Sequence, residues 1–394
     1  MVAGAGEDFR VTMCPACGRD AAAPFLARDA VPVHQNLVYA SAEAAVSAAR
    51  GDLHLACCGE CGFVFNTAFD FSKLSYGDDY ANDQTFSPAF SAYVDGLVRH
   101  LVEERGVRNA TVVEVGCGRG YFLRRLVEYP GANNRGIGFD PAYQGPDEEL
   151  GGRLRFERRY YGPDCTSVAA DVVVCRHVIE HLPRPAELVA QVHGALAASP
   201  SARLFFETPD VEWILRNDVI WDFFYEHCSL FTAASLTTLF EAGGARVESV
   251  DRIFGGQYLW LEGRRGDGGA DVRAPGDTPR LAARFAAHER DELAKWSARV
   301  AELRARGPLA IWGAGAKGVT FANLIDPARA LVDCVVDLNP QKQGAFVAGT
   351  GHPIVDYRAL GSRGVTTAIV MNPNYLDENR RLLREAGLAV ELIA

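Results

Sequence analysis

The segment that most constrains this chain is TVVEVGCGRGYF at residues 111–122, an apolar strand that breaks into a glycine-rich turn and then begins a helix. The turn carries glycines at alternate positions, Gly116, Gly118 and Gly120. Glycine leaves no side chain to hold a ligand off the backbone, and the helix expected from Arg119 presents unpaired N–H groups to a carboxylate or phosphate. A second apolar strand ends twenty residues later at Asp140, where an acid can accept both hydroxyls of a ribose. This order of features predicts a nucleotide-like ligand bound on a doubly wound α/β sheet.

The glycine spacing is G-x-G-x-G, whereas the pyrophosphate of a dinucleotide calls for G-x-G-x-x-G. With Glu114 two residues before the first glycine, the segment resembles the S-adenosylmethionine loop of class I methyltransferases. We therefore expect this cofactor to be contacted by the loop, by the end of the second strand, by the preceding aromatic loop and by the end of a later strand. The candidates are Glu114, Gly116, Gly118, Gly120, Asp140, Pro141, Tyr80, Arg176 and His177.

Length and charge limit what can surround this site. A chain of 394 residues is long enough for two or three domains with cores of their own. Lys and Arg number 40 against 50 Asp and Glu, and no basic run indicates a nucleic-acid groove or an anionic membrane surface. No apolar run reaches the ~18 residues of a membrane span, and the first ten residues lack the features of a signal peptide. We expect a cytoplasmic protein without nucleic-acid or membrane partners.

Four of the ten cysteines form two C-x-x-C-G knuckles about forty residues apart, Cys14 with Cys17 and Cys58 with Cys61. This pattern predicts a tetrahedral zinc site, and four thiolates leave no open position for water or substrate, so the metal should be structural. Buried reduced cysteines are the alternative. Cys57 adjoins Cys58, but the C-x-x-C spacing counted from Cys61 selects Cys58 as the ligand.

The segment after Phe71 is an aromatic loop followed by an amphipathic helix, expected over residues 88–104. Tyr76 and Tyr80 lie among Gly and Asp in this loop. They are candidates for a lid over the glycine turn, and core positions are the alternative.

Beyond the second strand, apolar strands and helices continue to alternate, which is typical of a parallel sheet with crossover helices. The expected elements are a strand at 171–175, a helix at 183–197 and a strand at 203–207. A last pair of strands joined at Gly255 and Gly256 predicts a hairpin at the sheet edge.

Two clusters carry candidate chemistry near the carboxyl edge of this sheet, the edge at which open α/β sheets bind ligands. The first is CRHVIEHL at residues 175–182, and the second is WDFFYEHCSLF at residues 221–231. The second cluster contains a phenol, an acid and a base in consecutive positions, at Tyr225, Glu226 and His227. The surrounding sequence lacks the apolar periodicity of a helix face that would bury them. A structural role is the alternative for any one histidine.

A domain boundary is expected in the polar segment RRGDGGADVRAPGDTP, residues 264–279. The predicted organisation is a zinc-binding module at 1–70, a methyltransferase domain at 71–263, a linker and charged helix at 264–306, and a Rossmann-like α/β domain at 307–394.

The last domain opens on a second glycine turn, WGAGAKG, with a G-x-G-x-x-G pattern at Gly313, Gly315 and Gly318 and an acid at Asp337 that ends the next strand. Taken alone this is a dinucleotide fingerprint. The segment holds only about four strands, however, which is half of a full dinucleotide fold. Lys317 inside the turn suits a diphosphate of another kind.

Two cysteine knuckles, a class I core, a Y-E-H segment and a terminal half-Rossmann unit running from WGAGAKG to VDLNP together resemble the sugar C-methyltransferases of deoxysugar biosynthesis. The resemblance covers nearly the whole chain. It implies a nucleotide-linked 4-keto-deoxysugar as acceptor, with the zinc module and the terminal domain closing over it. It also implies that His227 removes a proton beside the ketone. Further active-site roles fall on Tyr76, Tyr225, His181 and Glu226, and substrate contacts on Gly313, Gly315, Lys317, Gly318 and Asp337.

The chemistry of a carbon acid agrees with these residue types. Forming an enolate beside a ketone needs a base with a pKa near neutrality and donors aimed at the oxygen, whereas methyl transfer itself needs mainly proximity. We expect S-adenosylmethionine-dependent methylation of a small-molecule acceptor at carbon. O- or N-methylation is one alternative, and a dinucleotide-dependent oxidoreductase or binding module using the Gly313 loop is another.

Overall fold

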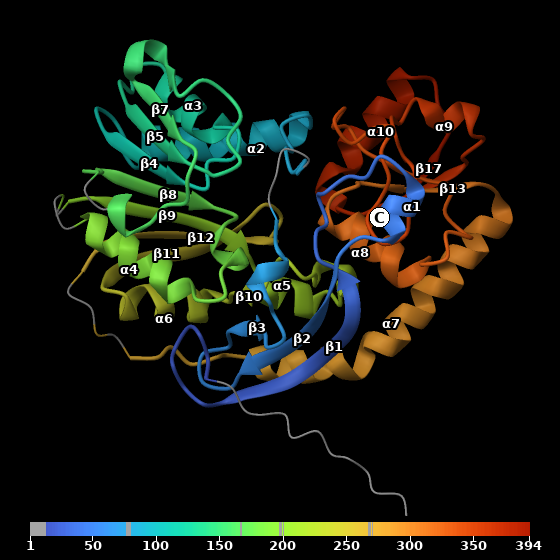
Figure 1. Ribbon diagram of the computed structural model, residues 1–394, viewed down its shortest axis with the longest axis horizontal. Coiled ribbons are helices and arrows are strands. Elements are labelled where there is room, and N and C mark those ends of the chain that lie inside the picture. Colours follow the sequence, from blue (N-terminus) through green and yellow to red (C-terminus); the bar gives the residue numbers. More distant parts are fainter. Residues whose placement is uncertain are drawn as a thin grey trace, which may run out of the picture.

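The computed structural model describes residues 13–75, 80–165, 168–196, 199, 201–266, 269 and 271–394. In this part of the chain the strands form a four-stranded, an eight-stranded and a five-stranded sheet. The eight-stranded and five-stranded sheets lie side by side, and the N-terminal strands and the long helix α7 run beneath them (Figure 1). The described helices include none with the length and apolar character needed to cross a membrane.

The four-stranded sheet belongs mainly to the N-terminal module. Its strands β1 (Ala22–Pro32), β2 (Arg50–Cys58) and β3 (Val64–Asn66) are antiparallel neighbours, and the short helix α1 (Ala42–Val46) lies between β1 and β2 in the chain. The fourth strand, β10 (Ser229–Leu230), comes from the methyltransferase region and pairs with β3. The N-terminal sheet therefore holds the chain immediately after the Y-E-H segment.

The eight-stranded sheet is the doubly wound sheet of a class I methyltransferase, as predicted. Its order is β11-β12-β9-β8-β4-β5-β7-β6. The strands are β4 (Thr111–Val115), β5 (Arg135–Phe139), β6 (Glu148–Glu149), β7 (Leu154–Glu157), β8 (Val172–Arg176), β9 (Arg203–Pro209), β11 (Ala245–Ile253) and β12 (Tyr258–Arg265). Five of them are parallel to one another: β4, β5, β7, β8 and β9. Strands β11 and β12 form the predicted hairpin at the sheet edge. The order reverses between β4 and β8, so the loops that follow these two strands flank the ligand crevice.

The helices of this domain are α2 (Pro88–Arg99), α3 (Tyr121–Glu128), α4 (Pro185–Ala195), α5 (Val211–Arg216) and α6 (Ala233–Ala242). The helix expected over 88–104 is α2 followed by a π-helical turn at His100–Glu104. Single 3₁₀ turns lie at Phe71–Lys73, Leu150–Gly152, Pro163–Cys165, Ile179–His181 and Ile220–Asp222.

The C-terminal domain has an entirely parallel sheet in the order β15-β14-β13-β16-β17. Its elements are β13 (Leu309–Trp312), α8 (Ala316–Ile325), β14 (Cys334–Val336), β15 (Ile354–Val355), α9 (Ala359–Ser362), β16 (Thr367–Val370), a 3₁₀ turn at Pro373–Tyr375, α10 (Leu376–Glu385) and β17 (Glu391–Ile393). The expected number of about four strands is corrected to five, because β15 and β17 have only two and three residues and leave little periodicity in the sequence. Strand order reverses between β13 and β16, which places the second glycine turn at a crevice of its own.

Helix α7 (Thr278–Arg306) connects the domains. Its first turns pack Leu281 and Phe285 against the N-terminal sheet, and its last turns pack Val300 and Leu303 into the core of the C-terminal domain. Helix α7 therefore contributes to the core under the N-terminal sheet at one end and to the core of the C-terminal domain at the other.

Candidate functional site

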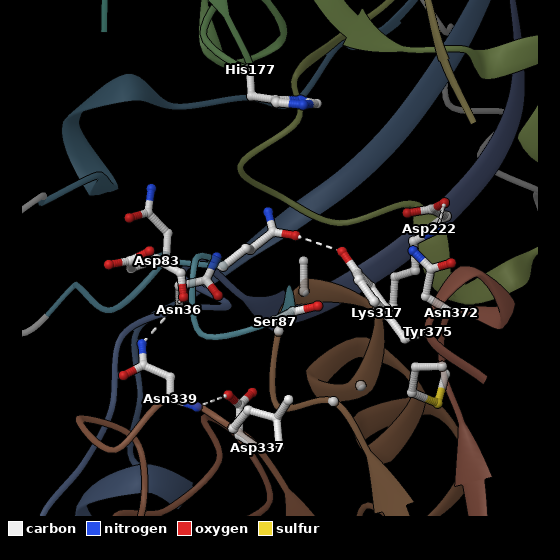
Figure 2. Close-up of a pocket in the computed structure, with 18 of the residues that line it drawn as sticks. Asn36, Asp83, Ser87, His177, Asp222, Lys317, Asp337, Asn339, Asn372 and Tyr375 are labelled. Carbon is white, nitrogen blue, oxygen red and sulfur yellow. Dashed lines mark hydrogen bonds and ion pairs between the residues drawn. The ribbon is translucent and has the colours of Figure 1, made fainter. Parts of the chain in front are cut away.

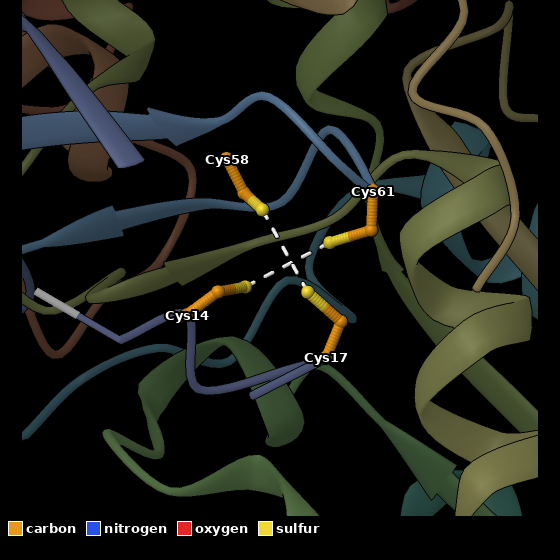
Figure 3. A group of neighbouring side chains, drawn as sticks. All are labelled: Cys14, Cys17, Cys58 and Cys61. Carbon is orange, nitrogen blue, oxygen red and sulfur yellow. Dashed lines mark hydrogen bonds between the residues drawn. The ribbon is translucent and has the colours of Figure 1, made fainter. Parts of the chain in front are cut away.

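The four predicted zinc ligands lie together (Figure 3). The Sγ atoms of Cys14 and Cys61 are 3.7 Å apart, those of Cys17 and Cys58 are also 3.7 Å apart, and all four lie within 4.8 Å of one another. A zinc ion with Zn–S bonds of ~2.3 Å in a tetrahedral site separates its sulfurs by about 3.8 Å. The donor set therefore fits a closed, structural zinc ion.

Cys57 is excluded from this cluster. Its buried thiol points to the backbone carbonyl of Cys58, 3.8 Å away, and burial raises the pKa of this thiol to about 12. Adjacent strand residues face opposite sides, so only one of the two cysteines can join the group. The structure thus agrees with the spacing argument that selected Cys58.

The first glycine turn has the backbone of a ligand loop, but its three glycines differ in role. All three have positive φ angles of 70°, 54° and 74°. A Cβ on Gly116 would collide with Val178 and one on Gly120 with the ring of Phe156, whereas a Cβ on Gly118 would meet nothing within 4 Å. The expectation that all three make room for a ligand is therefore corrected. Gly116 and Gly120 permit close packing, and Gly118 faces open space.

Asp140 is built into the same loop. One carboxylate oxygen accepts the N–H of Gly118 at 2.8 Å, and the other accepts the N–H of Ala142 at 2.8 Å. Each oxygen keeps a further lone pair for a ligand hydroxyl. Pro141 is exposed beside it.

Two buried polar atoms beside the loop lack a hydrogen-bond partner among the described residues, Oε2 of Glu114 and Nη2 of Arg176. Burial raises the pKa of Glu114 to about 8, against the pull of the Arg176 guanidinium. Arg176 lies over the ring of Phe122 at 4.7 Å and donates through Nε to Glu207 at 2.6 Å. A carboxyl and a guanidinium that each keep one unpartnered atom fit a ligand with an ammonium and a carboxylate group, as S-adenosylmethionine has.

A cavity of about 310 Å³ lies between the carboxyl edge of the eight-stranded sheet and the C-terminal domain. Figure 2 shows His177 on one wall and Asp337 and Asn339 on the opposite wall. The sequence-predicted residues among the described lining are Tyr80, His177, His181, Glu226, His227, Gly313, Gly315, Lys317, Gly318 and Asp337. The cavity therefore brings the Y-E-H segment and the second glycine turn to one space.

The two candidate histidines meet in this cavity. The rings of His181 and His227 are nearly perpendicular, at 88°, with centroids 4.8 Å apart, and the ring of Phe224 lies 4.0 Å from His227. Burial, followed by the nearby histidines and Lys317, lowers the pKa of His227 well below its ordinary value. Burial also lowers the pKa of His181. Both rings are therefore neutral near pH 7 and keep a nitrogen lone pair.

Glu226 is 1% exposed and is held from two sides. Oε1 accepts the hydroxyl proton of Tyr80 and Oε2 accepts the N–H of Gln35, each at 2.8 Å. Tyr80, which is predicted to contact the cofactor, is hydrogen-bonded to Glu226, and both residues line the cavity.

Tyr225 does not line the cavity. It is 0% exposed, its hydroxyl accepts the N–H of Asp70 at 2.8 Å, and a Cβ on Gly51 would collide with its ring. Phe224 lines the cavity instead, and the chain turns at Tyr225, where the N–H of His227 donates to the carbonyl of Phe224 at 3.2 Å. Tyr76 lies outside the described residues.

His177 is fixed by two carboxylates. Its Nδ1 lies 3.2 Å from Glu180 and its Nε2 lies 3.1 Å from Glu207, and the backbone has a positive φ of 55°. Burial acts to lower the pKa of His177, but the two carboxylates raise it to about 9. Tyr93 donates a further hydrogen bond of 2.5 Å to Glu207. His177 is therefore a partly buried cation immediately after β8.

The second glycine turn repeats the hydrogen bonds of the first. In the first turn Gly116 donates to the carbonyl of Phe139, and in the second Gly313 donates to the carbonyl of Val336, both at 2.8 Å. Asp337 accepts the N–H of Ala314 at 2.9 Å and that of Asn339 at 2.8 Å, as Asp140 does with its own loop. The second turn therefore has the same pattern of hydrogen bonds as the first. At its open end a Cβ on Gly315 would meet nothing within 4 Å, whereas Gly318 has no room for one because it packs on Gly313.

Lys317 crosses between the domains. Its ammonium pairs with Asp222 at 2.8 Å (Figure 2). It also donates to Gln257 at 2.9 Å and lies 5.1 Å from the centre of the Trp213 ring. The cation thus remains at the cavity wall, held by residues of the methyltransferase domain.

Sequence reasoning missed two residues of α10. Glu378 accepts hydrogen bonds from Ser87 and Ala89 through Oε2, but its buried Oε1 has no partner among the described residues. Asn379 is 1% exposed, and its Nδ2 also has none. Both residues line the cavity. The sequence around them, LDENRRLLRE, has the polar character of a surface helix, so no local signal indicates burial.

Two domain families match the chain in its sequence. The family described as “Methyltransferase domain” matches residues 90–250, and the family described as “C-methyltransferase C-terminal domain” matches residues 274–387. The first match contains the glycine loop and the Y-E-H segment, and the second contains all of α7 and most of the C-terminal sheet.

One curated relative is C-methyltransferase NovU of Streptomyces niveus, which is 33% identical to this chain over 121 residues. The aligned segment covers 30% of this chain and 25% of the length of NovU.

Similar solved structures include 1,6-didemethyltoxoflavin-N1-methyltransferase of Burkholderia thailandensis, 16% identical, covering 46% of this chain and 82% of that chain, with a TM-score of 0.35. Magnesium protoporphyrin IX methyltransferase (ChlM) of Synechocystis PCC 6803 is 18% identical, covering 45% of this chain and 84% of that chain, with a TM-score of 0.34.

The two family matches fall in order on the two α/β domains and together span the greater part of the chain. They agree with the glycine loop predicted to bind S-adenosylmethionine and with a cavity shared between the domains. The chain therefore combines a methyltransferase domain with the C-terminal domain of the C-methyltransferases.

Proposed function

We propose that this protein transfers a methyl group from S-adenosylmethionine to a carbon beside the ketone of a nucleotide-linked keto-deoxysugar, in the biosynthesis of a secondary metabolite such as an antibiotic. The observation that carries the proposal is the neutral imidazole of His227 in a cavity that also includes the second glycine turn. A base and a loop suited to phosphate in one space match an acceptor with a carbon acid at one end and a diphosphate at the other.

The cofactor residues are Glu114, Gly118, Asp140 and Arg176. Gly118 leaves space for the ligand at the loop, Asp140 has lone pairs for ribose hydroxyls, and Glu114 with Arg176 suits the amino-acid end. S-adenosylmethionine supplies an electrophilic methyl group on a sulfonium. The protein needs to align the acceptor carbon with it and exclude water, which is chiefly a matter of proximity.

His227 is the proposed base. Its free electron pair takes the proton from the acceptor carbon, the C–H electrons form the enolate, and the ketone is restored when that carbon takes the methyl group. The proton then leaves His227 for solvent. His181 is the proposed donor that stabilises charge on the oxygen, and such a donor acts strongly in a cavity of low dielectric. The hydroxyl of Tyr80 donates to Glu226 and holds that carboxylate in place.

The C-terminal domain is proposed to hold the nucleotide part of the acceptor. Gly313, Gly315 and Gly318 shape the turn at the start of α8, whose N-terminal N–H groups suit an anion, and Lys317 adds a cation. Asp337 braces the turn through its two hydrogen bonds. Glu378 and Asn379 present an acceptor and a donor to the remaining end of the ligand.

The zinc ion is proposed to be structural. Cys58 ends β2, and the same sheet contains β3, which pairs with β10 just after His227. The metal thereby supports the strand that positions the base.

The test uses the full chain with isotopically labelled S-adenosylmethionine and a panel of nucleotide-linked ketosugars, with analysis of products by mass spectrometry and NMR. The expected product carries the label on the carbon beside the ketone. In deuterated water with an inert cofactor analogue, that carbon should also exchange its hydrogen, because proton removal precedes transfer. Label on oxygen or nitrogen, without exchange, would overturn C-methylation and favour the O- or N-methyltransferase alternative.

A further inference from the structure

Glu180, His181 and His227 form a second group of metal-ligating side chains, separate from the four cysteines. Their candidate ligand atoms all lie within 4.8 Å of one another. Glu180 and His181 belong to the 3₁₀ turn after β8, and His227 approaches from the segment before β10. All three line the cavity, so an ion can reach them by the route that the acceptor uses.

The surroundings of this group resemble the outer shell of a metal site. Glu180 is already oriented, since one oxygen lies 3.2 Å from His177 and the other accepts the hydroxyl of Thr208 at 3.1 Å. The ring of His181 makes a hydrogen bond with the backbone of Glu226. Metal-binding carboxylates and imidazoles commonly make such contacts with their remaining atoms, which fixes the orientation of the ligand. Carboxylate oxygens also keep a second lone pair.

The donor set determines which ions it can bind. Two imidazoles and one carboxylate select divalent transition metals of borderline softness, whereas Mg²⁺ and Ca²⁺ prefer sets made only of oxygen. Three protein ligands leave coordination positions open, in contrast to the closed four-thiolate site.

We propose that Glu180, His181 and His227 bind a divalent transition-metal ion such as Zn²⁺, Co²⁺ or Ni²⁺, and that the occupied state is inactive. A nitrogen lone pair of His227 that is bound to a metal cannot take a proton from the acceptor. The metal site itself rests on the geometry of the three side chains, and the inhibition rests on the proposed role of His227 as the base.

The experiment uses the purified full chain with its cysteine-bound zinc, titrated with Co²⁺. We expect one further equivalent of Co²⁺ with weak visible ligand-field absorption and without the thiolate charge-transfer band of a cysteine site. His181→Gln and His227→Gln should each weaken this binding by more than the roughly 10–100-fold typical of outer-shell changes, and Thr208→Val by about tenfold. His288→Gln, an exposed histidine of α7, is the matched control and should leave binding unchanged.

Turnover is measured in parallel. Methyl transfer should fall in proportion to Co²⁺ occupancy and return when a weak chelator removes Co²⁺ but leaves the cysteine site loaded. Absence of a second equivalent, or equal binding by the two histidine variants and the control, would overturn the site. Full turnover at full occupancy would overturn the inhibition. A preparation that binds Co²⁺ as expected but makes no C-methyl product with any acceptor would sink the proposed function and leave the metal site standing.

Discussion

The ammonium of Lys317, in the first turn of α8, forms an ion pair of 2.8 Å with Asp222 of the methyltransferase domain. Both side chains are largely buried, at 17% and 13% exposed. The residue predicted to bind a diphosphate is therefore also a contact between the two α/β domains. The proposed binding of the acceptor and the contact between the domains would consequently share one side chain.

Lys317→Gln should raise the KM for a nucleotide-linked acceptor by roughly 10–100-fold, since a hydrogen bond to a charged group contributes about 1.5–3 kcal/mol. Asp222→Asn breaks the same ion pair but keeps the ammonium, so it should raise KM much less. Steady-state kinetics with both variants makes the comparison, with Lys295→Gln on an exposed position of α7 as the control. An equal rise in KM for Lys317→Gln and Asp222→Asn would mean that the lysine serves only to dock the domains.

Gly118→Ala should abolish measurable S-adenosylmethionine binding, because the added Cβ enters the open space over the loop. The matched control is Gly151→Ala, in the turn after β6. Gly118 and Gly151 have positive φ angles of 54° and 66°, and a Cβ on either meets nothing within 4 Å, so both variants carry a similar strain of about 1–2 kcal/mol. Isothermal titration together with thermal unfolding separates the two effects. Wild-type affinity in Gly118→Ala would refute the assignment of the loop.

Binding of S-adenosylmethionine should release about one proton per chain at pH 7, since burial raises the pKa of Glu114 to about 8 and a nearby positive charge favours the carboxylate. Affinity should accordingly rise with pH up to about 8 and then level off, because the protonated form has to lose its proton to bind. Titration calorimetry in buffers of different ionisation enthalpy measures the proton directly. Glu114→Gln should bind more weakly and release none, and identical heats for the wild type in all buffers would contradict the prediction.

The purified protein should contain about one zinc ion per chain, bound by four thiolates. Cys58→Ser should lose the metal and much of its stability, because Cys14, Cys58 and Cys61 belong to one hydrophobic core with Val113 and other residues of the methyltransferase sheet. Cys57→Ser alters the neighbouring residue outside the cluster and should keep the zinc. Elemental analysis and thermal unfolding report the two results. Retention of full zinc in Cys58→Ser would remove that ligand from the site.

His227→Asn should lower turnover by roughly 10²–10⁴, the usual contribution of a positioned general base, with cofactor affinity nearly unchanged. It should also suppress exchange of the acceptor hydrogen in deuterated water. Because burial lowers the pKa of His227, the wild-type base stays deprotonated above pH 6.5, and loss of turnover through its protonation begins only below that pH. Normal exchange in His227→Asn would pass the role of base to another group, with His181 the first to be tested.

The sequence determined the parts whose hydrogen bonds and packing depend on contiguous residues. In both α/β domains the acid that ends the second strand accepts a backbone N–H of the glycine turn that follows the first strand. This hydrogen bond depends on a short run of sequence. The loops at Gly118 and Gly315 and the acids Asp140 and Asp337 could therefore be predicted. Two C-x-x-C knuckles likewise specify a metal site through spacing alone, because each pair already presents its thiolates on one turn.

Only the tertiary structure decided which side chains of a segment reach the cavity. Tyr225 and Phe224 are adjacent, and the packing of Tyr225 over Gly51 and its bond to Asp70 turn Phe224 inward. The burial of Asn379 and the pairing of Lys317 with Asp222 depend on segments more than ninety residues away in the chain. Such contacts arise when separate domains dock, and no local pattern of charge or hydrophobicity encodes which residues will face each other there.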